Sequence, residues 1–252
     1  MGSVIAFANQ KGGVAKTTTV HSLGDAFLER GRSVLLVDLD PQACLTYAVG
    51  IDADVLDGTL HDVVVGRANA VDVLIERDGC PAILPSSIDL AGAEVHLLTK
   101  TGREYVLARA LQPLINAFDY VLLDCSPSLG ILTINGLTAA RYVAIPFQCE
   151  TLSNRGVGQL LETVDDVRSF TNESLKILGG IATMFDARTR LAQEVLADVG
   201  TAYNLEVLDP PIPKSVRVAE APGHGLSVLR HAPTSPAAVA YRDLAASIEA
   251  HT

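Results

Sequence analysis

Short apolar runs alternate with longer helical stretches along most of the chain, and this alternation constrains the fold more than any other feature. Runs rich in Val, Ile and Leu are typical of parallel strands that are buried on both faces. We expect strands at residues 4–8, 34–38, 82–85, 120–124, 142–146 and 177–184, with a weaker one at 207–208. Helices are expected at residues 17–30, 103–117, 131–140, 156–170, 191–203 and 236–250.

The order of these elements predicts βαβ units. Right-handed crossovers would wind them into a doubly wound, mostly parallel twisted sheet flanked by helices, an α/β fold. Gly31 is placed as the C-cap of the first helix, and Ser235 as the N-cap of the last, with Pro236 in its first turn. The 252 residues contain no internal repeat or Pro/Ser-rich linker, and 48% are hydrophobic, so we expect a single domain over residues 1–252.

A glycine-bearing loop with two lysines directly follows the first expected strand. Residues 9–19 read NQKGGVAKTTT and lead into the first expected helix. Gly12 and Gly13 allow backbone N–H groups to turn inward, Lys16 supplies an ammonium and Thr17 a hydroxyl for Mg²⁺. The loop departs from the plain G-x-x-x-x-G-K-[ST] pattern, so a glycine turn with solvated lysines stays open as the alternative.

Carboxylates follow two other expected strands. Asp38 and Asp40 end the second strand, and Asp124 ends the fourth. The carboxyl ends of parallel strands border the crevice where such sheets bind ligands, close to where a metal-bound phosphate would lie. A lone Asp at a strand end is more often a helix cap or turn residue. The glycine-bearing loop followed by two strands that end in Asp, however, favours a P-loop nucleotide site.

Charge and cysteine usage exclude several classes of protein. The 29 acidic and 19 basic residues give a formal charge of −10, so the whole surface is not a polycation, although a local basic face could still bind nucleic acid. The four cysteines are far apart and form no C-x-x-C pair, which disfavours a metal knuckle. With neither a secretory signal nor a membrane span evident, we expect a soluble cytoplasmic protein.

These residues resemble the ParA/Soj family of deviant Walker ATPases, a MinD-like branch of P-loop proteins that positions chromosomes, plasmids and other cargo. ANQKGGVAKTTT is similar to the family's deviant Walker A loop, VLLVDLDPQ to its first switch, and FDYVLLDCSPSLGILTINGLTAA to its Walker B strand and second switch. The later blocks IPFQCETLSNRGVGQLLETV, MFDARTRLAQEV and IPKSVRVAEAPGHGLSV also resemble the family, so the likeness covers essentially the whole chain.

The resemblance implies a role for each matching residue. Lys11 would be the signature lysine, which reaches the partner's phosphates across a nucleotide-sandwich dimer, and Lys16 would hold the β- and γ-phosphates. Thr17 would bind Mg²⁺, Asp40 would be the switch carboxylate needed for hydrolysis, and Asp124 would support the metal. The implied catalytic residues are Lys11, Lys16, Asp40 and Asp124, and the implied metal site is Thr17, Asp40 and Asp124.

The resemblance also implies where the nucleoside and DNA would bind. Segments 184–186 and 211–213 would frame the adenine, with ordinary packing and a rigid turn as the alternative. The implied nucleotide-binding residues are Lys11, Gly12, Gly13, Val14, Ala15, Lys16, Thr17, Thr18, Met184, Asp186, Pro211, Ile212 and Pro213. Arg188, Lys214 and Arg217, together with Arg190, would form a basic patch for sequence-independent DNA binding, unless they are merely solvated.

Ala15 departs from the family, which usually has glycine there. An alanine costs roughly 1 kcal/mol or more if its φ is positive. We expect Ala15 to leave nucleotide binding intact and to alter hydrolysis or the dimer equilibrium.

The resemblance implies an ATP-dependent DNA-partitioning switch. ATP would join a homodimer that binds nonspecific double-stranded DNA, and a ParB-like protein or cargo adaptor would stimulate slow hydrolysis on the nucleoid. A MinD-like membrane-associated ATPase is one alternative, but residues 237–252 contain Arg242 as their only Lys or Arg, so membrane targeting is disfavoured. A cluster-handling relative similar to the nitrogenase iron protein is another, for which Cys125 is the candidate ligand and a buried structural cysteine the simpler interpretation.

Overall fold

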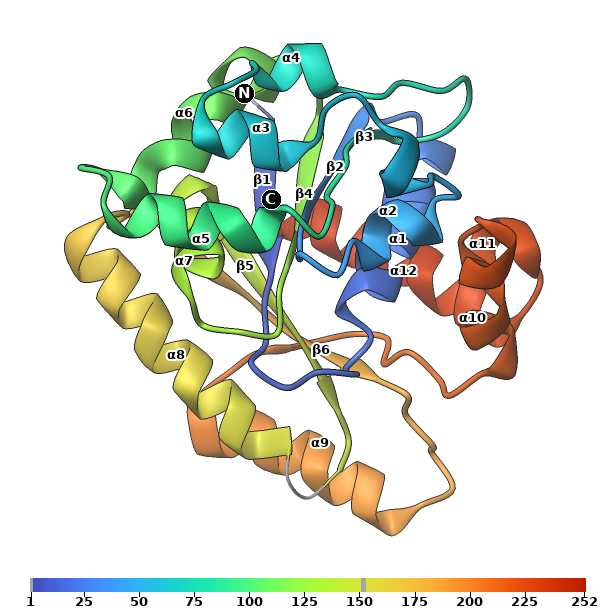
Figure 1. The fold of residues 1–252 in the computed structure, drawn as a ribbon. Helices are drawn as coiled ribbons and strands as arrows, with labels where there is room; N and C mark the ends of the chain where they lie inside the picture. Colours follow the sequence, from blue (N-terminus) through green and yellow to red (C-terminus); the bar gives the residue numbers. More distant parts are fainter. Residues whose placement is uncertain (1, 151–152) are drawn as a thin grey trace.

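A parallel sheet forms the centre of the molecule in the computed structural model, which describes residues 2–150 and 153–252 (Figure 1). Its strand order is β3-β2-β4-β1-β5-β6-β7, and every neighbouring pair is parallel. This confirms the expected α/β fold and all the expected strands, with ends shifted by one or two residues. The strands are β1 (Ser3–Phe7), β2 (Val34–Leu39), β3 (Ala82–Leu84), β4 (Tyr120–Cys125), β5 (Tyr142–Gln148), β6 (Lys176–Thr183) and β7 (Val207–Leu208).

Helices cover both faces of the sheet, which explains why its strands are apolar throughout. The side chains of α1 (Lys16–Glu29) and α12 (Pro236–His251) pack into one apolar cluster, around Phe7 and Leu36. A second cluster lies on the other face, around Leu35 and Leu123. It includes side chains of α6 (Val106–Ile115), α7 (Ile131–Ala139), α8 (Ser153–Phe170) and α9 (Arg190–Tyr203).

The longer expected helices are confirmed with small shifts. The first helix ends at Glu29, and its C-cap is Arg30 instead of the expected Gly31. Gly31 is the next residue and has a φ of 78°. Ser235 does cap α12, since its side chain accepts a hydrogen bond from the Ala238 N–H. The helix expected at 103–117 is divided into a 3-10 turn, Arg103–Tyr105, followed by α6.

The sequence analysis missed several short helices because four to nine residues carry too little periodicity to distinguish a helix from a loop. The α3 helix, for example, is defined by a capping box between Thr59 and Asp62 rather than by a long apolar pattern. The missed α-helices are α2 (Cys44–Ala48), α3 (Leu60–Val65), α4 (Ala70–Val73), α5 (Leu90–Leu98), α10 (Val216–Glu220) and α11 (Val228–His231).

The apolar face of α12 is used inside the fold. Tyr241, Leu244 and Ile248 are fully buried, and the Tyr241 hydroxyl lies 3.2 Å from the Thr19 hydroxyl of α1. This packing occupies the face that a membrane-targeting helix would need. Among the described residues, no helix is long and apolar enough to cross a membrane.

Strand register brings the expected site residues together at one edge of the sheet. Asp124 on β4 pairs with Phe7 at the end of β1 and with Asp38 at the end of β2. The phosphate loop leaves β1 at this edge, so the two carboxylates lie beside it. The topology therefore supports the ligand crevice that the sequence predicts.

Candidate functional site

The loop between β1 and α1 is held in place by a buried amide. Asn9 donates to the Pro146 carbonyl oxygen at 2.8 Å and accepts from the Lys11 backbone N–H at 2.9 Å. The neighbouring Gly156 on α8 must be a glycine, because a Cβ there would lie 2.7 Å from the Asn9 Oδ1. These contacts fix how the loop leaves the strand.

Two residues of the loop adopt left-handed backbone conformations. Gly13 has a φ of 74°, which glycine adopts without strain. Ala15, the N-cap of α1, has φ 62° and ψ 33°. Its φ is therefore positive, and in this conformation the methyl group of alanine is unfavourable. The loop therefore has the bent shape that turns backbone N–H groups inward, but keeps strain at the residue before Lys16.

A buried lysine and a buried carboxylate lie at the base of the loop. Lys16 is 7% exposed, its Nζ donates to the Lys11 carbonyl oxygen at 3.4 Å, and burial lowers its pKa while the charge of Asp124 opposes that shift. Asp124 is 1% exposed, and among the described residues neither of its carboxylate oxygens makes a hydrogen bond of ordinary geometry, although the Thr17 hydroxyl is near enough to lower its pKa. Burial, reinforced by the charge of Asp38, raises the pKa of Asp124 well above its usual range. An orphaned buried carboxylate of this kind fits a cation site.

Asp38 has a structural task that the sequence analysis did not assign. Its carboxylate accepts from the Thr46 backbone N–H at 2.9 Å, from the Thr46 hydroxyl at 2.7 Å and from the Asp40 backbone N–H at 3.2 Å. Burial raises the pKa of Asp38 to about 6. Ser86 donates its hydroxyl to the Asp40 carbonyl oxygen at 2.8 Å, so the backbone of Asp40 is held on two sides while its side chain faces the cavity.

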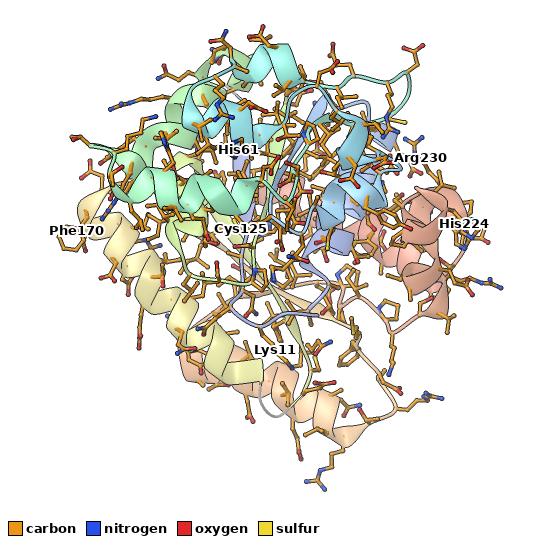
Figure 2. The ribbon with its side chains drawn as sticks, viewed as in Figure 1. Lys11, His61, Cys125, Phe170, His224 and Arg230 are labelled. Carbon is orange, nitrogen blue, oxygen red and sulfur yellow. The ribbon has the colours of Figure 1, made fainter. Side chains whose placement is uncertain are left out.

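Gln148, at the end of β5, connects the loop between β1 and α1 to Met184, one of the residues expected to frame the adenine. Its Nε2 donates to the Gly13 carbonyl oxygen at 2.8 Å and lies 2.9 Å from the sulfur of Met184. Its Oε1 accepts from the Lys11 Nζ at 3.2 Å, and the same ammonium donates to Glu150 at 3.2 Å. Lys11 thus lies at the edge of the loop near the N-terminal end of α8 (Figure 2). The sequence signal for Gln148 was its place in the block that begins at Ile145.

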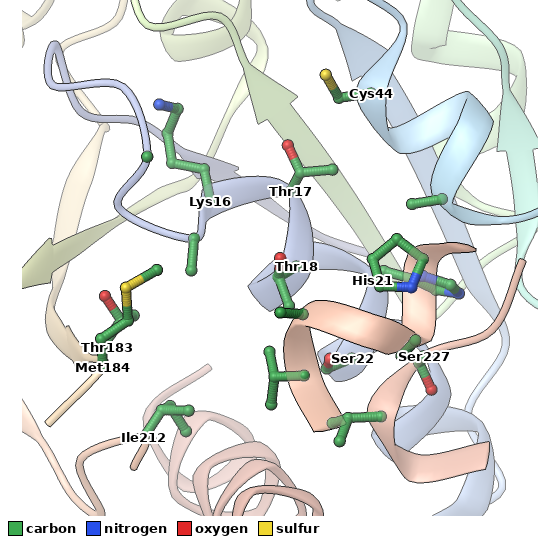
Figure 3. Close-up of a pocket in the computed structure, with 18 of the residues that line it drawn as sticks. Lys16, Thr17, Thr18, His21, Ser22, Cys44, Thr183, Met184, Ile212 and Ser227 are labelled. Atoms are coloured by element: carbon green, nitrogen blue, oxygen red, sulfur yellow. The ribbon is translucent and has the colours of Figure 1, made fainter. Parts of the chain in front are cut away.

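The structure brings most of the expected nucleotide residues around one cavity of about 870 Å³ (Figure 3). A cavity of this size is within the usual range for ligand sites. Its lining also includes residues that sequence reasoning missed, among them His21, Tyr47 and Tyr241. The expected site residues that line it are Gly12, Gly13, Ala15, Lys16, Thr17, Thr18, Asp40, Met184, Ile212, Pro213 and Lys214. Those that do not are Lys11, Val14, Asp124, Asp186, Arg188, Pro211 and Arg217.

The two segments expected to frame the adenine are joined to each other. Phe185 and Pro213 form a parallel bridge, in which the Phe185 N–H donates to the Ile212 carbonyl oxygen at 2.9 Å and the Lys214 N–H donates to the Phe185 carbonyl oxygen at 3.1 Å. This bridge also brings the start of α9 near the segment that leads to α10. Arg188 and Arg217 are therefore carried by connected segments.

Each of the expected DNA-binding arginines is paired with a nearby carboxylate. Arg188 forms a bidentate pair with Asp186 at 2.8 and 2.9 Å, and this pairing lowers the pKa of Asp186 to about 2. Arg190 contacts Glu194 at 2.7 Å, and Arg217 contacts Glu220 at 2.9 Å. The patch is thus a set of exposed ion pairs, which solvent and salt screen, so each contributes little to stability.

Known proteins with similar sequences identify the family. The family described as an AAA domain matches residues 2–177. The chain is 41% identical to the chromosome-partitioning ATPase Soj of Treponema pallidum, and the alignment covers 99% of this chain and 98% of that protein. The chain belongs to the ParA/Soj family of partitioning ATPases.

Solved structures place this ParA/Soj chain among P-loop ATPases of the same fold. The cell division ATPase MinD of Pyrococcus furiosus is 25% identical, with a TM-score of 0.82 and complete coverage of both chains. A Mycobacterium smegmatis protein named cobyrinic acid a,c-diamide synthase, with bound ADP and magnesium, is 50% identical, with a TM-score of 0.90 over all of this chain and 95% of that one. The name of that relative describes its own activity and assigns none to this chain.

Within the later block at 145–164, residues 151 and 152 lie outside the described residues. Cys125 is buried at the end of β4, and burial raises the pKa of its thiol (Figure 2). Among the described residues, no group of three His, Cys, Asp or Glu side chains is placed to hold a metal ion.

Proposed function

We propose that this chain, as one domain over residues 1–252, binds ATP with Mg²⁺ at the phosphate loop and hydrolyses ATP slowly. The observation that carries the proposal is the buried Lys16 and the orphaned Asp124 carboxylate beneath a loop bent by Gly13 and Ala15. A cation and a polyphosphate would satisfy both groups at once. The ADP and magnesium bound to the M. smegmatis relative support this assignment.

The residues divide the work of phosphoryl transfer in a simple way. Mg²⁺, when bound, neutralises charge on the phosphates, and Thr17, Asp40 and Asp124 are the residues that would hold it directly or through water. Lys16 balances charge on the β- and γ-phosphates from the loop side. Asp40 orients the attacking water, and the contacts of Asp38 and Ser86 keep its backbone in place.

Lys11 would act on a second copy of the chain. Its ammonium lies at the edge of the loop, on Gln148 and Glu150, and not over the cavity that Lys16 lines. In an ATP-joined homodimer, Lys11 would exchange these contacts for the partner's phosphates. The energy of that exchange would make the dimer depend on the triphosphate.

The dimer would carry the DNA-binding face. Arg188, Lys214 and Arg217 would bind phosphates of double-stranded DNA without contacting bases, and the dimer would double their number. The intrachain carboxylates hold these arginines only weakly, so phosphates can displace them. A ParB-like protein or cargo adaptor would then stimulate hydrolysis and release the carrier from the nucleoid, which would position a chromosome or plasmid.

DNA retention with ATP, with ADP and without nucleotide, at two salt concentrations, tests the proposal. We expect retention only with ATP and its loss at the higher salt concentration. Lys16→Ala should lose ATP binding and DNA retention, whereas Arg217→Ala should lose DNA retention alone. Lys100→Ala removes the same charge from an exposed position away from the site and serves as the control. Equal retention in all nucleotide states would contradict the switch.

A further inference from the structure

The cavity beside the phosphate loop extends past the residues assigned to the nucleotide. In Figure 3, Met184 and Ile212 lie on one side of Thr18, and His21 and Ser227 lie on the other. We call this second part the His21 lobe. We assign to it His21 and Ser227, together with Tyr47, Ala48, Val218 and Leu226 from the lining of the same cavity.

His21 is the polar group that the lobe offers to a ligand. It is 5% exposed, and within residues 2–150 and 153–252 no hydrogen bond to its ring is found. Burial lowers the pKa of His21 to about 4, so at neutral pH the ring offers one N–H donor and one nitrogen acceptor. Because the ring lines the cavity, its nitrogens are accessible to a ligand that enters the lobe.

Two charged groups near His21, Asp25 and Arg230, are already engaged with each other. Asp25 is 2% exposed and accepts from the Arg230 Nη2 at 2.6 Å, from its Nε at 2.8 Å and from the Ser227 hydroxyl at 2.5 Å. Their mutual neutralisation leaves little net charge on this wall of the lobe. The charge of Asp25 favours the protonated ring of His21, whereas those of Arg230 and Arg77 favour the neutral ring.

The remaining walls are apolar. Ala48 of α2 is 3% exposed, while Val218 and Leu226 come from α10 and the turn before α11. Tyr47 lines the cavity yet is 64% exposed, so its ring is available to stack on a flat ligand. Apolar walls with one or two polar groups are typical of small-molecule sites.

We propose that the His21 lobe binds a small, uncharged, planar molecule with one N–H or O–H group, beside the bound nucleotide and hydrogen-bonded to His21. Such a ligand would contact α2, which follows Asp40, and α10, which carries Arg217. It would therefore contact elements next to both the hydrolytic carboxylate and the DNA-binding face. The inference does not depend on DNA binding, so the two can fail separately.

Indole is a suitable probe, because it is planar and uncharged and has one N–H donor. We would titrate it into the full chain saturated with ADP and Mg²⁺, and follow the His21 Cε1–H resonance, assigned by its loss in His21→Gln. We expect a saturable shift with a Kd on the order of 1 mM, as suits a ligand of this size. His21→Phe should weaken binding at least tenfold, and His96→Phe, on the exposed side of α5, should not change it.

Ala48→Leu fills the lobe from α2 and provides an independent variant if His21→Phe does not fold, as judged by thermal melting. It should also weaken indole binding at least tenfold. The absence of a saturable shift at His21 would overturn the proposal. So would displacement of indole by ADP, because the lobe would then belong to the nucleoside. Unchanged binding in both folded variants would overturn it as well.

Discussion

Replacing Ala15 with glycine should stabilise the protein. Ala15 is held at φ 62°, where a residue with a Cβ is disfavoured by about 1–2 kcal/mol. Glycine removes that penalty but gains about 0.5–1 kcal/mol of conformational freedom in the unfolded chain. The difference leaves a net stabilisation of roughly 0.5–1 kcal/mol, or a rise in Tm of about 1–4 °C for a chain of this length.

Thermal unfolding without nucleotide measures this effect directly, and the chain offers two matched controls. Ala43, at φ 52°, is also left-handed but lies outside the phosphate loop, so Ala43→Gly should give a similar rise. Ala197 is exposed in the middle of α9, where glycine should lower stability by about 1 kcal/mol. If Ala15→Gly lowers the Tm as Ala197→Gly does, the strain argument is wrong.

The same variant separates strain from function. We expect Ala15→Gly to keep the ATP affinity of the original chain and to change its turnover or its dimer equilibrium, because the residue sets the loop shape immediately before Lys16. Unchanged affinity, turnover and dimerisation would show that the strain has no functional effect.

Three other variants test different groups. Asp124→Asn should abolish Mg²⁺-dependent ATP turnover yet raise the metal-free stability by about 1–3 kcal/mol, since it removes an unpaired buried carboxylate; turnover assays and urea unfolding measure the two effects. Burial lowers the pKa of His21 from 6.5 to about 4 in the folded chain, so its contribution to stability is present above pH 6.5 and is lost as the pH falls towards 4. Relative to His21→Gln, the free energy of unfolding of the original chain should fall by about 3 kcal/mol across that range, as measured by urea unfolding. Glu220→Gln frees Arg217 from its ion pair and should tighten ATP-dependent DNA binding about threefold at low salt, as measured by fluorescence anisotropy.

Each of these variants has its own control. Asp243→Asn, on α12, makes the same change of charge as Glu220→Gln. If Asp243→Asn raises DNA affinity equally, the ion pair of Arg217 is irrelevant to the effect. A constant difference between the original chain and His21→Gln from pH 7 to 4 would contradict the buried neutral ring. Retained turnover in Asp124→Asn would remove Asp124 from the metal site.

The sequence by itself determined the architecture of this protein and the position of its phosphate loop. Short apolar runs that alternate with helical stretches predict a parallel sheet covered on both faces, and the loop with Lys16 then lies at the carboxyl edge of that sheet. The loop is a local pattern in the chain, and the winding of the sheet follows from the right-handedness of its crossovers. The architecture and the position of the loop can therefore be predicted from residue order, as can the family.

Tertiary structure alone decided which neighbours complete the site. Asp38 and Asp124 lie 86 positions apart in the sequence but are paired in register. Burial raises the pKa of both carboxyls, and the charge of Asp38 raises that of Asp124 further. The φ of Ala15 and the isolated ring of His21 likewise depend on packing with distant segments. Burial, long-range register and pairing arise only when remote parts of the chain meet, so no local pattern could encode them.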